Sequence, residues 1–106
     1  MKTYRVNFRP MAEADLFALY EYIAAEAGHA VAGAYIDRIE DACLALQTFP
    51  ERGTRRDDIR PGLRTIGVEK RVTIAFQVKG SDVTILRIFY GGRDYERSLR
   101  RRPRRR

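Results

Sequence analysis

The chain has little of the chemistry on which disulfides, metal sites and nucleophilic triads depend. Its 106 residues include one cysteine and one histidine. A single cysteine excludes an internal disulfide and any multi-thiolate metal site, and the position of Cys43 in a helical stretch indicates a buried packing thiol. Without a Cys or His partner, neither Cys43 nor His29 supports a nucleophile–base pair. We therefore expect no metal, no cofactor and no catalytic triad.

Long apolar runs are also missing. No run approaches the roughly 18 residues that a membrane span needs, and the N-terminal MKTYRVNFRP has no apolar segment behind its charges, so no signal peptide is visible. With 44% apolar and 33% charged residues, the composition is that of an ordinary globular protein. We expect a cytoplasmic protein with one domain in residues 1–99, followed by a disordered basic tail in residues 100–106.

Positive charge is concentrated in the second half of the chain. Residues 1–50 carry four basic and seven acidic side chains, whereas residues 51–106 carry seventeen basic and seven acidic ones. A basic half attracts nucleic acid or an acidic protein segment, without deciding between them. Direct nucleic-acid binding through this half therefore stays open.

Three strands are predicted in the basic half. Residues 72–78 alternate apolar with polar side chains, which is typical of a strand with one face on a core. Residues 83–90 are dominated by β-branched and aromatic types, and only Thr84 and Arg87 are polar, which predicts a strand covered on both faces. A shorter strand over residues 63–67 precedes them. All three belong to one sheet.

The first half supplies the elements that cover this sheet. Residues 3–8 alternate like a strand, and Pro10 suits the first turn of a helix whose apolar stripe continues to Gly28. A second helix is expected from about residue 30 to residue 48. The short link between them predicts an antiparallel helical hairpin. Residues 51–61 are expected to be a polar loop.

The order β-α-α-β-β-β predicts an α+β fold, with an antiparallel four-stranded sheet packed on an N-terminal helical hairpin. If each connection reverses the chain, the last strand lies antiparallel to the first. The expected order across the sheet is first, fourth, third and second strand.

Three short segments resemble one known superfamily. They are residues 46–53 (LQTFPERG), 59–64 (IRPGLR) and 85–94 (ILRIFYGGRD). In this order and spacing they resemble the RelE/ParE superfamily, the toxin halves of type II toxin–antitoxin modules. The resemblance covers residues 2 to about 96. It implies the fold just described and a role as a toxin.

Two branches of that superfamily imply different chemistry. RelE-like members are ribosome-dependent mRNA endoribonucleases, and that resemblance implies Arg71, Arg93 and Tyr95 as catalytic residues, with cations on the scissile phosphate. However, this sequence offers no obvious His or Glu as a base. ParE-like members poison DNA gyrase without such a set, and residues 49–64 and 87–94 resemble them more closely. We expect the ParE-like function and leave enzymatic activity open, with an unrelated basic binding module as the third alternative.

Four arginines on or beside the strands are the expected target-binding residues: Arg64, Arg71, Arg87 and Arg93. Each has a structural alternative, because arginines on a sheet face often form surface ion pairs. For Arg87 that alternative is an ion pair with an acid from the first half of the chain. Arginines of the 51–61 loop are expected to be partly neutralised by Asp57 and Asp58.

The resemblance also implies a partner. A cognate ParD-like antitoxin would form a hetero-oligomer with the toxin by folding a disordered, acidic and amphipathic tail onto it. The expected antitoxin-binding residues lie on the helical hairpin: Leu16, Leu19, Tyr20, Ile23, Tyr35 and Ile39. For the two tyrosines the alternative is packing with a solvated hydroxyl.

Overall fold

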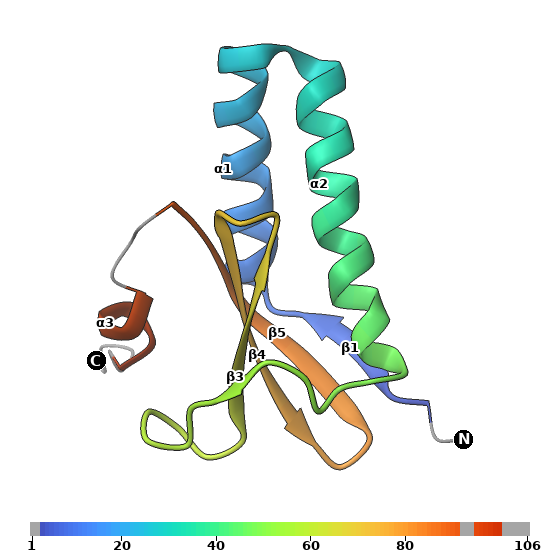
Figure 1. The fold of residues 1–106 in the computed structure, drawn as a ribbon, viewed down its shortest axis with the longest axis vertical. Helices are drawn as coiled ribbons and strands as arrows, with labels where there is room; N and C mark the ends of the chain where they lie inside the picture. The colour runs from blue at the N-terminus through green and yellow to red at the C-terminus, as the bar shows by residue number, and fades with distance from the viewer. Residues whose placement is uncertain (1–2, 92–94, 101–106) are drawn as a thin grey trace.

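A computed structural model describes residues 3–91 and 95–100. The elements, in chain order, are β1 (Arg5–Phe8), α1 (Pro10–Ala27), α2 (His29–Leu44), a 3₁₀ turn (Ala45–Gln47), β2 (Thr54–Arg55), β3 (Leu63–Val68), β4 (Val72–Lys79), β5 (Asp82–Tyr90) and α3 (Tyr95–Arg100). The helices α1 and α2 form an antiparallel hairpin against one face of the sheet (Figure 1).

The ends of α1 follow from its sequence. Pro10 stands at the first helical position, where its missing N–H costs nothing. Gly28 ends the helix with φ +96°, and its N–H donates to the Ala24 carbonyl. The chain then turns directly into α2, so the predicted helical hairpin is confirmed.

The strand order across the sheet is β1-β5-β4-β3-β2. The predicted order of the four longer strands is therefore confirmed, but two features differ. The sheet has a fifth strand, β2, at its edge, and β1 pairs with β5 in parallel. The antiparallel prediction for this pair was wrong because the 51–61 segment was treated as a plain loop. In fact β2 lies antiparallel to β3, which adds one reversal of the chain.

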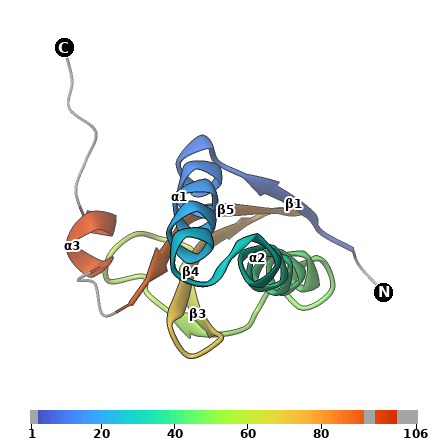
Figure 2. The same cartoon turned by 90° about the horizontal axis from the view of Figure 1, so that it is seen from above.

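Apolar side chains cover both faces of the sheet. The hairpin face holds the main core, in which Ile39, Ile74, Phe76, Val83 and Ile85 are fully buried. On the opposite face, a second cluster brings Leu99 of α3 onto the strands, and α3 lies well apart from the hairpin (Figure 2). The members of this second cluster are Leu63, Ala75, Leu86, Phe89 and Leu99. As predicted, β5 is covered on both sides.

A register shift interrupts the alternation of side chains along β5. Ala75 pairs with Arg87, whereas the next residue, Phe76, pairs with Ile85, so Leu86 is an extra residue on β5. Ile88, three residues after Ile85, therefore packs in the same main core, although strict alternation would place it on the opposite face.

Residues Tyr95–Arg100 near the C-terminus form α3. Arg100, expected at the start of a disordered tail, is the last residue of this helix, and its guanidinium lies 3.3 Å from the Asp58 carboxylate. Residues 101–106, the rest of that expected tail, lie outside the described residues. Within residues 3–91 and 95–100, no helix has the length and apolar character to cross a membrane.

Candidate functional site

The side chain of Arg87 forms an ion pair with Asp15 inside the fold. Its Nε donates to Asp15 at 2.8 Å and its Nη2 donates to the other carboxylate oxygen at 3.1 Å. The guanidinium carbon also lies 4.9 Å from the centre of the Phe89 ring. Both partners of the ion pair are largely buried, and the Asp15 carboxylate raises the pKa of Arg87. The predicted structural alternative for Arg87 is thus confirmed, and target binding by this residue stays a prediction.

The expected target-binding arginines do not meet at one point. Arg64 lies opposite Phe76 in the β3–β4 pair, whereas Arg71 precedes Val72 at the other end of β4. Phe76 lies five positions after Arg71 along the chain, or roughly 16 Å at about 3.3 Å per residue. Among described residues, these arginines therefore belong to separate surfaces.

The remaining residues expected for a ribonuclease are not described. Arg93 lies outside the described residues, and nothing is placed for the side chain of Tyr95, the first residue of α3. Catalysis by Arg71, Arg93 and Tyr95 therefore stays a prediction. Among the described residues, no group of three or more His, Cys, Asp or Glu side chains could hold a metal ion.

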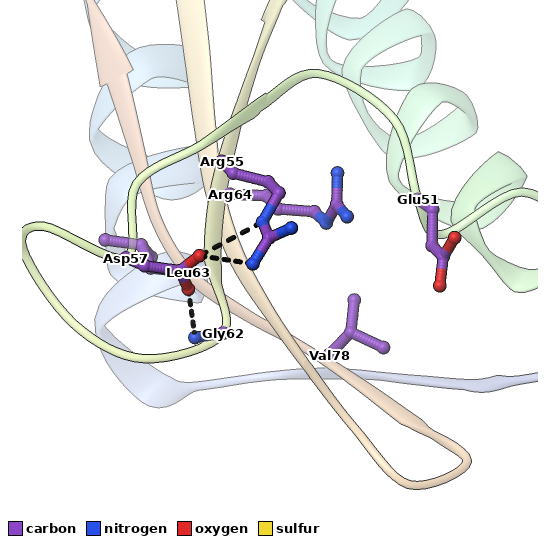
Figure 3. Close-up of a pocket in the computed structure, with 7 residues that line it drawn as sticks. All are labelled: Glu51, Arg55, Asp57, Gly62, Leu63, Arg64 and Val78. Carbon is purple, nitrogen blue, oxygen red and sulfur yellow. Dashed lines mark hydrogen bonds and ion pairs between the residues drawn. The ribbon is translucent and has the colours of Figure 1, made fainter.

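Arg64 lines a pocket of about 290 Å³ at the β2 edge of the sheet. Its guanidinium is directed into this pocket, with Arg55 on one side and Glu51 on the other (Figure 3). Val78 forms an apolar part of the floor. The lining comes from four separate segments: Glu51, Arg55 with Asp57, Gly62 to Arg64, and Val78. We call this site the edge pocket.

Asp57 and Arg64, two charged residues of the edge pocket, differ in the number and length of their hydrogen bonds. Asp57 is fully engaged, because one oxygen accepts Arg55 Nη2 at 2.6 Å and the other accepts the Gly62 N–H at 2.9 Å. These hydrogen bonds, the one from Gly62 first, lower the pKa of Asp57. Arg64, in contrast, donates only one long bond of 3.4 Å, to the Arg52 carbonyl. Arg64 therefore forms no ion pair with a described carboxylate, although its charge helps to lower the pKa of Asp57.

A second ion pair within the 51–61 segment joins Arg56 to Asp58. Arg56 binds Asp58 through two nitrogens, at 3.0 and 2.9 Å. These hydrogen bonds lower the pKa of Asp58 to about 2. Arg60 donates to the Leu99 carbonyl at 3.2 Å and so ties the loop to α3. The prediction that Asp57 and Asp58 neutralise loop arginines is confirmed.

A tyrosine cluster lies at the opposite end of the sheet from the edge pocket. The Tyr90 ring contacts Tyr22 at 5.9 Å and Tyr35 at 6.3 Å between centroids. Arg38 lies 5.4 Å from the Tyr35 ring centre and pairs with Glu69 at 3.1 Å. Burial, with the nearby Tyr90 and Glu69, raises the pKa of Tyr35.

Arg71 lies beside this tyrosine cluster. Its carbonyl accepts the Gly91 N–H at 2.8 Å, which places the residue next to the end of β5. Its positive charge acts on Tyr35 and opposes the rise in the pKa of that phenol. Its exposed guanidinium makes no hydrogen bond or ion pair with any described residue. Sequence reasoning selected Arg71 but missed Tyr90, whose position just before Gly91 at a strand end was the available signal.

The expected antitoxin-binding residues divide into two groups. Leu16, Leu19, Ile23 and Ile39 are at most 9% exposed and pack in the main core. The reason is that the apolar stripe of each helix faces the sheet, which leaves little of these side chains for a partner. Tyr20 and Tyr35 are half-buried, and their contact with an antitoxin stays a prediction.

Other apolar side chains of the hairpin are exposed. The sequence analysis missed them because they interrupt the polar faces of the helices singly. They are Met11, Phe17, Tyr22, Val31, Leu44 and Phe49, each at least 50% exposed. Single exposed apolar residues are normal, and these six are distributed along the hairpin and its C-terminal extension.

Comparisons with known proteins agree with one another. The family model described as ParE toxin of type II toxin-antitoxin system, parDE, matches residues 6–95. Toxin ParE3 of Caulobacter vibrioides is 38% identical over 86 residues, which are 81% of this chain and 84% of that protein.

Two solved structures share the fold. A chain of the chromosomal ParDE TA system from P. aeruginosa is 29% identical, with a TM-score of 0.73 over 84% of this chain and 97% of that one. A chain of the toxin-antitoxin complex RelBE2 from Mycobacterium tuberculosis is 25% identical, with a TM-score of 0.56 over 85% and 93%.

Proposed function

This chain belongs to the ParE toxin family of type II toxin–antitoxin systems, and from that premise we propose that it poisons DNA gyrase and is neutralised by a ParD-like antitoxin. The match of the ParE family model over residues 6–95 is the main reason for proposing a ParE-like and not a RelE-like function. The likeness to the ParDE structure, with a TM-score of 0.73 against 0.56 for RelBE2, supports the same branch.

The described arginines are arranged for separate contacts with a large target. Arg64 and Arg71 lie at opposite ends of β3, and Arg87 is already paired with Asp15. Arg93 and the side chain of Tyr95, which the ribonuclease alternative needs, lie outside the described residues. A toxin that acts by binding needs no convergence of cations on one phosphate, since separate arginines can contact separate parts of its target.

Arg71 is the residue we propose at the centre of the gyrase contact. It is exposed, and it makes no hydrogen bond or ion pair with the described part of the chain. Tyr22, more than half exposed, and Tyr90 lie on the same side of the fold and supply aromatic surface. Arginine and tyrosine are the residue types that most often dominate binding energy in protein interfaces.

The hairpin is the surface we propose for the antitoxin. Its exposed apolar residues, Phe17 and Leu44 among them, suit an amphipathic segment that folds on binding. The formal net charge of +7 favours an acidic segment. Covering this surface with a partner removes apolar area from water, at about 25 cal/mol for each Å² buried.

A paired assay tests the proposed target. The purified chain is added to DNA gyrase with relaxed plasmid and, separately, to a translating extract with labelled mRNA. We expect inhibition of supercoiling and accumulation of cleaved DNA, with the mRNA intact. Arg71→Ala should lose the inhibition, whereas Arg5→Ala, on the far edge strand, should retain it. Cleavage of mRNA on the ribosome together with normal supercoiling would establish the RelE-like alternative instead.

A further inference from the structure

We propose that the edge pocket is the anchoring site for an acidic side chain of the antitoxin, with Arg64 as the residue that binds its carboxylate. This inference rests on the proposed function, because it names the partner chemistry of one part of the antitoxin surface. The pocket lies at the β2 edge of the sheet, and its lining residue Glu51 follows the exposed Phe49 by two residues. One partner segment can therefore contact both Phe49 and the pocket.

Arg64 is the group in the edge pocket that has hydrogen-bond donors left for an anion. Both oxygens of Asp57 are in use, by Arg55 and by the Gly62 N–H. The half-buried Arg64 guanidinium has only its 3.4 Å bond to the Arg52 carbonyl. Guanidinium groups bind carboxylates through two parallel N–H···O bonds. Arg64 forms no such pair of bonds with any described residue.

The size and lining of the pocket fit a side chain. Its volume of about 290 Å³ is at the lower limit of small-ligand pockets. Val78 gives the floor an apolar part against which methylene groups can pack. The aliphatic stem of a glutamate, or an apolar neighbour of an aspartate, would fill this part while the carboxylate meets Arg64.

The apolar part of the lining favours a polypeptide acid over a nucleic-acid backbone. Both a carboxylate and a backbone phosphate carry one negative charge, so the charges of Glu51, Asp57, Arg55 and Arg64 act alike on the two. Beside Val78, however, the methylene groups of a side chain can pack, whereas a sugar-phosphate backbone is polar. The lining therefore suits the acid of a polypeptide.

The test measures the dissociation constant of the full chain with the purified protein encoded beside it. Arg64→Gln should weaken this complex at least about 10-fold, because it removes one partner of the charge pair that the antitoxin would cover. The matched control Arg5→Gln makes the same change of charge at the opposite edge strand, in an exposed pair with Asp82, and should stay within about 2-fold. Thermal melting of each variant checks that it is folded.

A second variant keeps the test independent of any folding defect at Arg64. Glu51→Gln removes an exposed acid that repels the incoming carboxylate, and should strengthen the complex about 2-fold or more. Weaker binding by Glu51→Gln would overturn the inference. A charge swap then identifies the anchoring acid. When one acid of the partner is replaced by lysine, that partner variant should bind the Arg64→Glu variant of this chain. The acid whose replacement restores the complex is the anchor.

The outcomes separate the two proposals. If wild-type chain forms no complex with its neighbour, the proposed antitoxin interaction fails and this inference with it. If the complex forms and Arg64→Gln binds as tightly as Arg5→Gln, only the edge-pocket inference is overturned. Inorganic phosphate and a 20-base-pair DNA duplex serve as further probes. Arg64-dependent binding of either one would assign the pocket to phosphate and overturn the inference as well.

Discussion

The carboxylate of Asp15 on α1 replaces a missing strand beside Ile88 on β5. The parallel pairing of β1 with β5 ends at Phe8 opposite Ile85, and the Arg9 N–H still donates to the Ile85 carbonyl. Three residues farther along β5, the Ile88 N–H has no β1 residue to bind and donates instead to Asp15 at 2.8 Å. The same carboxylate also accepts two hydrogen bonds from the half-buried Arg87 guanidinium. One side chain therefore binds both a free backbone N–H at the strand edge and a positive charge.

Asp15→Ala should lower the free energy of unfolding by about 2–4 kcal/mol, because it leaves the Ile88 N–H and the Arg87 charge without their acceptor. Asp15→Asn can still accept from Ile88 and should cost about half as much. Urea denaturation followed by circular dichroism measures both. The control Asp82→Asn breaks the exposed pair with Arg5 and should cost less than about 1 kcal/mol. Equal costs at Asp15 and Asp82 would contradict this role for Asp15.

Gly53 should be the least replaceable of the turn glycines. Its φ is +76°, and a Cβ added there would lie 2.2 Å from the Thr65 carbonyl oxygen, where β2 pairs with β3. Gly53→Ala therefore forces β2 away from the sheet and should cost at least about 2 kcal/mol. Gly80 has φ +62° with open space around it, so Gly80→Ala should cost about 1 kcal/mol. Chemical denaturation of the two variants side by side would refute the argument if Gly80→Ala were the worse.

Cys43 should be chemically inert in the folded protein. The side chain is fully buried, and burial together with Glu40 raises the pKa of its thiol to about 12. The protonated thiol reacts slowly, so a thiol reagent such as Ellman's should modify Cys43 at pH 8 only after denaturant is added. The absorbance of the released chromophore follows the reaction. Rapid modification of the native protein would show that the site opens or that the thiolate is present.

Protonation of Asp58 at low pH should lower the free energy of unfolding. Arg56 lowers the pKa of Asp58 to about 2 in the folded chain, below the ordinary value of 3.8. A lowered pKa in the folded state stabilises the protein above about pH 4, and this contribution disappears as the pH falls toward 2. Asp58→Asn should therefore flatten the dependence of the urea midpoint on pH between 4 and 2. Asp37→Asn, at an exposed acid on α2, should leave that dependence as in the wild type.

Local signals in the sequence were enough for the main elements. Pro10 and Gly28 fix the ends of α1, and the period-two alternation of residues 72–78 fixes the faces of β4. The pairing of Arg87 was also predictable, because a charge in a strand covered on both faces needs an acid. Its partner, Asp15, is 72 residues away and could not be identified from the sequence.

Other features have no local signal. The direction of β1 against β5 depends on β2, and Thr54-Arg55 is too short and polar to show a strand period. Leu99 covers a sheet face, yet it is a single apolar residue in an arginine-rich segment. The edge pocket joins Glu51, Arg64 and Val78 from three segments, and only the folded register of β2, β3 and β4 brings them together.

We propose that this toxin acts on gyrase by binding, and the decisive experiment measures the supercoiling of relaxed plasmid by purified gyrase over a titration of the chain. We expect a dose-dependent loss of supercoiling, with linear DNA released after detergent and protease. Prior addition of the co-encoded antitoxin should restore supercoiling, and Arg71→Ala should not inhibit it. Unchanged supercoiling at a large molar excess of folded wild-type chain would contradict this proposal.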